Sequence, residues 1–265
     1  MIAKLGAGPS GRIRCLRGCR RLIRLGRTPG GRAVPEQDLI YRNEAESYER
    51  LILREDHEGN LIRALQEIVS VRGKTVVDLG AGTGRFTRAL AGSARRIIAI
   101  DISRHMLKLA RERMPEGRPG NWGFVVGDNR RLPFRSRIAD IAIAGWSFGH
   151  ATVWYGDHWR DEIGACIDEM TRVLGRGGTA IICETLGTGS MEPRAPTPTL
   201  ADYYRLLDTE LQFHRMQIST DYKFSSLDEA VGAIRFFFGD ELADKVAMNR
   251  WTVVPEWTGI WWRKA

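Results

Sequence analysis

The pattern best suited to ligand binding in this sequence is one acid followed by three alternating glycines: Asp78, Gly80, Gly82 and Gly84. The pattern begins inside an apolar, β-branched run, TVVDL, and ends where a helical pattern begins. Glycine at such a turn lets the backbone bend sharply and approach a ligand where a Cβ atom would collide. A dinucleotide fingerprint needs a glycine where this chain has Arg85. The spacing therefore favours a ligand other than a nicotinamide dinucleotide.

Two further acids close the next two expected strands. Asp101 ends the run IIAID, and Asp128 follows GFVVG. The carboxyl ends of parallel strands meet at one edge of a sheet, and this is where ligands bind. Each acid alone could be a helix cap, and the glycines alone could form a tight connection. Three acids at successive strand ends, beside a glycine-rich turn, instead favour a ligand site.

These motifs resemble, in the same order, those of the class I S-adenosylmethionine-dependent methyltransferases, in particular the small-molecule branch typified by ubiquinone and menaquinone biosynthesis. The resemblance covers about residues 40–185 and includes the segments SRHML (103–107), LPF (132–134) and EMTRVLGRGG (169–178). It implies S-adenosylmethionine as cofactor, with Asp101 binding the ribose hydroxyls and Asp128 the adenine amino group. The cofactor-binding residues that it implies are Asp78, Gly80, Gly82, Gly84, Asp101, Ile102, Met106, Asp128, Asn129 and Trp146.

The sequence gives fewer indications of the methyl acceptor than of the cofactor. In-line methyl transfer depends on alignment and exclusion of water, so a general base is needed only if the acceptor must lose a proton. His150 follows the fourth expected strand and should lie near the transferred methyl group, which makes it the candidate base. A capping or core role is the alternative. His214 and Tyr222 are further candidates, and tryptophans near the mouth of the site either wall an acceptor pocket or pack the core.

Alternating apolar strands and helices predict an α/β fold: a Rossmann-like doubly wound sheet, mostly parallel, with an antiparallel last strand and a C-terminal helical insertion. Strands are expected at 75–79, 96–100, 123–126, 139–144 and 179–183, then at 216–224 and, as a closing edge strand, at 251–262. Helices are expected at 40–53, 61–68, 85–91, 104–113, 159–174 and 200–213, and from Ser226 through Phe238.

The net charge of +8 is confined to the start of the 265-residue chain. Residues 1–35 hold nine basic and no acidic side chains, whereas the rest balances 31 basic against 32 acidic ones. We expect 1–35 to be a flexible basic arm, with a membrane-surface segment or an organellar presequence as alternatives. We expect 36–265 to be the methyltransferase domain, comprising N-terminal helices (36–72), a cofactor-binding core (73–190) and a substrate-side region (191–265). Because residues 36–265 carry no excess of basic side chains, they do not support a nucleic-acid partner.

Composition excludes several other classes of protein. No apolar run approaches the roughly 18 residues of a membrane span. Four cysteines are too few for a disulfide scaffold, which favours a reducing, cytoplasmic location. The five histidines show no metal-ligand spacing. The predicted function is methyl transfer to a small-molecule acceptor; the alternatives are an RNA or protein methyltransferase and a catalytically silent S-adenosylmethionine-binding module. The oligomeric state is left open.

Overall fold

The computed structural model describes residues 45–115 and 120–265. The described residues all belong to one compact unit within 34–265. The predicted arm and the beginning of the first predicted helix lie outside the described residues. Within the described ranges, no helix is both long and apolar enough to cross a membrane.

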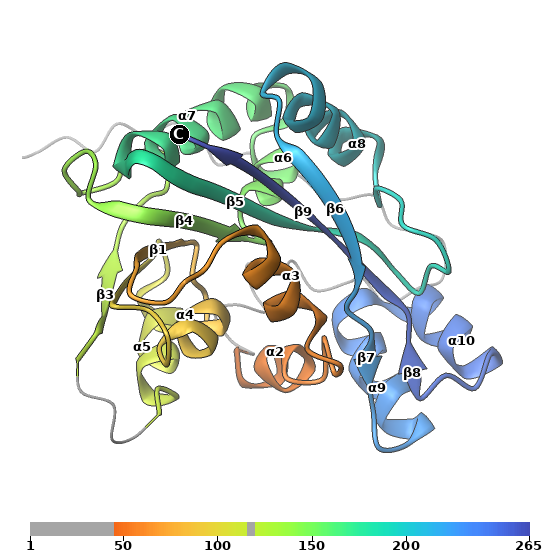
Figure 1. Ribbon diagram of the computed structural model, residues 1–265. Coiled ribbons are helices and arrows are strands. Elements are labelled where there is room, and N and C mark those ends of the chain that lie inside the picture. Colours follow the sequence, from red (N-terminus) through yellow and green to blue (C-terminus); the bar gives the residue numbers. More distant parts are fainter. Residues whose placement is uncertain (1–44, 116–119) are drawn as a thin grey trace, which may run out of the picture. The chain divides into compact units, whose positions relative to one another are not determined.

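One seven-stranded sheet organises the described residues, in the order β3-β2-β1-β4-β5-β9-β6 (Figure 1). Neighbouring strands from β3 to β5 run parallel, and β9 is antiparallel to both β5 and β6. The predicted Rossmann-like sheet with an antiparallel last strand is thereby confirmed. The strands are β1 (Thr75–Leu79), β2 (Arg96–Asp101), β3 (Trp122–Val126), β4 (Ala139–Gly145), β5 (Leu174–Thr188), β6 (His214–Ser219) and β9 (Glu256–Lys264).

Helices cover both faces of this sheet (Figure 1). On one face, α7 and α8 pack over Ile182 of β5; on the other, α3 and α4 pack over Ile181 and Cys183. Because helices cover both faces, β1 is buried along its whole length and β4 along most of its length. The helices are α2 (Ala45–Ile52), α3 (Asn60–Ile68), α4 (Arg85–Leu90), α5 (Arg104–Glu112), η1 (Phe148–His150), α6 (Ala151–Trp154), η2 (Gly156–His158), α7 (Trp159–Val173), α8 (Pro198–Arg205) and η3 (Leu206–Glu210).

The helical insertion lies between the last strands and has a small core of its own. Helices α9 (Leu227–Phe238) and α10 (Asp240–Met248) are flanked by β7 (Tyr222–Lys223) and β8 (Val253–Val254), which form a separate two-stranded sheet. Ser226 caps α9 by accepting a hydrogen bond from the Glu229 amide at 3.1 Å, as the spacing of these residues predicts.

Three predicted elements differ from the structure. The last strand is not at the edge: β9 begins after Pro255 and lies between β5 and β6, so β6 forms the edge. The predicted strand 216–224 is split, because the chain leaves the sheet after Ser219 and pairs with β8. The predicted helix 200–213 is shorter, since α8 ends at Arg205 and a wider π-helical turn follows it. Pairing partners distant in sequence decided the first two of these differences.

Candidate active site

The glycine turn after β1 requires glycine at Gly80 for two reasons. Its φ is 68°, in the left-handed region, and a Cβ atom there would lie 2.0 Å from the Ser147 hydroxyl oxygen. Gly82 and Gly84 also have positive φ values, of 53° and 83°. The Gly80 amide donates to the Ile100 carbonyl oxygen at 2.8 Å, which ties the turn to the end of β2. The turn is therefore fixed between β2 and the segment that follows β4.

Asp101 joins the end of β2 to the glycine turn. One carboxylate oxygen accepts a hydrogen bond from the Gly82 amide at 2.8 Å, and the other accepts one from the Ser103 amide at 2.7 Å. Burial raises the pKa of this carboxyl group, while the two amide bonds oppose the rise. The next residue, Ile102, exposes 67% of its surface beside this acid, whereas Met106 is buried against Gly82. The arrangement presents a fixed acid and an apolar side chain at one point on the carboxyl edge.

Asp78 contacts the helix that follows the turn. Its Oδ2 atom accepts hydrogen bonds from the Thr87 amide at 3.1 Å and the Thr87 hydroxyl at 2.6 Å. The side chain is only 1% exposed, and burial raises the pKa of its carboxyl group to about 6. Asp78 thus anchors the turn to α4 through Thr87. Its predicted contact with a cofactor stays a prediction.

Asp128 lies beyond the end of β3 in an ion-pair network. Its carboxylate accepts two hydrogen bonds from the Arg130 Nε atom, at 2.9 and 3.0 Å, and Arg130 also pairs with Glu162 of α7 at 2.6 Å. The hydrogen bonds from Arg130 lower the pKa of Asp128. Next to it, the Asn129 amide nitrogen donates to the Ser147 hydroxyl oxygen at 3.1 Å. The Asn129 Oδ1 atom is buried and has no hydrogen-bond partner among the described residues.

The segment after β4 carries Trp146 and His150. Trp146 has a φ of 48°, and its ring stacks on Phe86 with centroids 6.0 Å apart, while the Arg85 guanidinium lies 4.5 Å from the ring centroid. His150 is half-buried in η1, and its ring stacks on Trp154 with centroids 4.9 Å apart. His150 therefore lies on the segment that borders the glycine turn, while its predicted proximity to the transferred methyl group stays a prediction. Its role as a base stays a prediction.

The other two base candidates lie on different elements. His214 is exposed on β6, and β5 and β9 separate that strand from β4. Tyr222 is buried in β7, where its ring stacks with Phe224. The structure does not place either residue on the segment that carries His150.

Buried acids at this edge were missed by the sequence analysis. Glu55 forms an ion pair with Arg85 at 2.8 Å, and burial raises the pKa of its carboxyl group. Glu256, at the start of β9, accepts a hydrogen bond from the Thr185 hydroxyl at 2.8 Å, and burial raises the pKa of its carboxyl group to about 8. Glu184 is buried on β5. For Glu184 the available signal was an acid within the mostly apolar run IICETLG.

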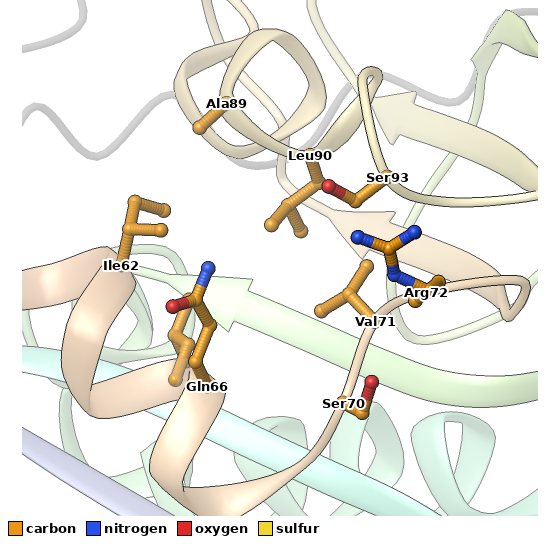
Figure 2. Close-up of a pocket in the computed structure, with 9 residues that line it drawn as sticks. Ile62, Gln66, Ser70, Val71, Arg72, Ala89, Leu90 and Ser93 are labelled. Atoms are coloured by element: carbon orange, nitrogen blue, oxygen red, sulfur yellow. The ribbon is translucent and has the colours of Figure 1, made fainter.

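A pocket of about 280 Å³ lies between α3 and α4 (Figure 2). Its lining includes Ile62 and Gln66 of α3, Leu90 of α4 and Arg72. Arg72 precedes β1, so this pocket lies toward the amino ends of the strands, opposite the glycine turn. It shares no residue with the site described above.

Residues 76–178 match the family model described as "Methyltransferase domain". A demethylmenaquinone methyltransferase of Clavibacter sepedonicus is 31% identical over 123 residues, which are 46% of each chain. A ubiquinone/menaquinone biosynthesis C-methyltransferase of Ectopseudomonas mendocina is 32% identical over 143 residues, or 52% of this chain and 50% of the relative. The chain thus spans about half the length of these two curated relatives.

A solved structure, a putative methyltransferase of Bacillus halodurans C-125, has the same fold with a TM-score of 0.50. It is 16% identical, and the match covers 76% of this chain and 97% of that structure. The sheet order, the glycine turn after β1 and the acid that ends β2 define a Rossmann-like domain. More particularly, residues 76–178 of this domain are similar to a methyltransferase domain.

Proposed function

We propose that this protein transfers a methyl group from S-adenosylmethionine to a small-molecule acceptor. The observation that carries the proposal is the placement of Asp101: its carboxylate is hydrogen-bonded to the Gly82 amide, at the edge where ligands bind in such sheets. The relatives described above act, by their names, on quinone precursors. Their activity supports a small-molecule acceptor here.

The residues present fit this cofactor. At Gly80, the backbone lies so close to Ser147 that a Cβ atom would overlap the Ser147 hydroxyl oxygen. Asp101 offers carboxylate oxygens to hydroxyl donors such as those of a ribose, and the buried Asn129 Oδ1 atom accepts no hydrogen bond from the described residues. Exposed Ile102 offers an apolar surface for a flat base. A polar ribose and an apolar base therefore each find a complementary group.

Bound S-adenosylmethionine supplies a methyl group on a sulfonium, which is an electrophile. The chain's own residues bind and align the reactants, with Asp101 and the glycine turn holding the nucleoside. His150 takes up the proton that a hydroxyl or carbon acid acceptor loses, since an imidazole changes charge near neutral pH. Trp154, stacked on His150, restricts the orientation of that ring. Alignment of the reacting atoms lowers the barrier to such a displacement.

Incubation with methyl-labelled S-adenosylmethionine and a fractionated metabolite pool tests the proposal. We expect label in a small-molecule fraction, and we expect Asp101→Asn to abolish it at low cofactor concentration. Label in RNA or protein would favour the alternative acceptors. Binding of the cofactor without any transfer would identify a silent binding module and overturn the proposal.

We also propose a reducing compartment for the protein. Cys166 and Cys183 are free and buried, and burial raises the pKa of the Cys166 thiol to about 12. Such thiols are unreactive packing groups.

A further inference from the structure

Glu184 is a buried carboxyl group at the carboxyl edge of the sheet. It is 4% exposed, and its Oε1 atom accepts hydrogen bonds from the Gly149 amide at 2.8 Å and the Tyr203 hydroxyl at 3.5 Å. Within the described part of the chain, no basic side chain forms an ion pair with Glu184. A buried acid with uncharged partners is costly to maintain, so its presence calls for a physical reason.

The strand register places Glu184 next to the segment that carries His150. Gly145, the last residue of β4, pairs with Cys183, so Glu184 is the next residue beyond that pair. A Cβ atom at Gly149 would lie 2.9 Å from the Glu184 Oε2 atom. A side chain at position 149 would therefore require the Glu184 carboxyl group to shift. The Gly149 carbonyl oxygen in turn accepts a hydrogen bond from the Thr152 hydroxyl at 2.7 Å.

The same segment is fixed at its other end to the proposed cofactor site. Ser147 accepts a hydrogen bond from the Asn129 amide and lies against Gly80 of the glycine turn. Residues 147–149 therefore connect the glycine turn to Glu184, and His150 follows immediately. Gly149, which Glu184 holds, is thus adjacent in sequence to His150.

We propose that Glu184 is a positioning residue, whose ionised carboxylate holds the 147–150 segment, and with it His150, in the arrangement that methyl transfer requires. The inference rests on the proposed function. A carboxylate accepts a stronger hydrogen bond from an amide than a neutral carboxylic acid does, so ionisation tightens the segment. Burial raises the pKa of Glu184 to about 8, which places the change within reach of experiment.

The groups that face this carboxyl group do not titrate in the same range. Tyr203 and Tyr204 of α8 face it from one side, and burial raises the pKa of each phenol well above its ordinary value. Cys183 precedes it on β5, and burial likewise raises the pKa of that thiol. On β9 the residue opposite is Gly259, which has no titratable side chain. Burial also raises the pKa of Glu256 to about 8, and Glu256 accepts a hydrogen bond from Thr185, the residue after Glu184. Variants at both acids are therefore needed to assign a transition near pH 8 to Glu184.

Nuclear magnetic resonance of the full chain tests the inference without requiring turnover. The Gly149 amide resonance should shift with pH around 8 in the unmodified protein and lose that transition in Glu184→Gln, which retains a carbonyl acceptor of the same shape. Glu256→Gln is the matched control, because it removes another buried acid of raised pKa and should leave the Gly149 transition in place. A Gly149 resonance that titrates identically in Glu184→Gln would overturn the inference.

Turnover gives the second measurement. At saturating cofactor we expect Glu184→Gln to lower kcat about five- to tenfold and to remove the rise in kcat through pH 8. Its affinity for S-adenosylhomocysteine should stay within about twofold of the unmodified protein. An unchanged pH profile in an active variant would refute the positioning role. Absence of methyl transfer by the unmodified protein would instead refute the proposed function and leave the resonance result standing.

Discussion

Asp101→Asn is the substitution that tests the cofactor site most directly. The ionised carboxylate accepts the Gly82 and Ser103 amides at 2.8 and 2.7 Å, and ribose hydroxyls would add two more donors. An asparagine keeps one acceptor oxygen but turns an NH2 group toward one of these donors. Hydrogen bonds to charged groups contribute about 1.5–3 kcal/mol, against about 0.5–1.5 kcal/mol for neutral ones. Losing one charged bond should therefore weaken S-adenosylhomocysteine binding by about 10- to 150-fold.

Isothermal titration calorimetry measures this change, with circular dichroism to confirm folding. Asp140→Asn is the matched control: Asp140 lies at the start of β4, and its carboxylate accepts a hydrogen bond from the Thr75 amide at 2.8 Å. It is the same substitution at the opposite edge of the sheet and should leave affinity unchanged. If a folded Asp101→Asn protein binds S-adenosylhomocysteine as tightly as the Asp140→Asn control does, the assignment of Asp101 to the ribose is refuted.

Four further outcomes are expected. Gly80→Ala should lower the unfolding free energy by about 2–4 kcal/mol, because it adds left-handed backbone strain and overlap with Ser147. Adding Ser147→Gly should recover about half of that loss. An equal loss in the double variant, measured by urea denaturation, would contradict the overlap. His150→Ala should lower turnover in a labelled-cofactor assay with cofactor affinity retained, and unchanged turnover would return His150 to a structural role. Folding raises the pKa of Glu256 from 4.5 to about 8, so the free energy of unfolding should fall as the pH rises from 4.5 to 8. Glu256→Gln should reduce this dependence on pH. An identical pH dependence in the variant would refute the raised pKa of Glu256. Deletion of residues 1–33 should leave the melting temperature and cofactor affinity unchanged, and a large loss of either would show that this segment packs on the domain.

The sequence alone determined the features that depend on local geometry. Gly80, Gly82 and Gly84 predict a turn because glycine readily adopts the left-handed backbone conformation found there. Asp101 was identified as a candidate ligand-binding residue because it ends an apolar run that has the length and composition of a strand. The alternation of strands and helices likewise predicted the parallel sheet, since both faces of such a sheet are buried. All of these signals lie within a few residues of the feature that they predict.

Only the tertiary structure decided what the remaining acids do. Asp128 was identified from its strand, but its ion pair with Arg130 extends to Glu162, which a different helix supplies. Glu184 and Glu256 come together with their partners through the pairing of β4, β5 and β9, and the inner position of β9 was itself not predicted. Strand order and buried polar partners depend on contacts between residues far apart in the chain. Such contacts form only when the whole domain packs, and no local pattern encodes them.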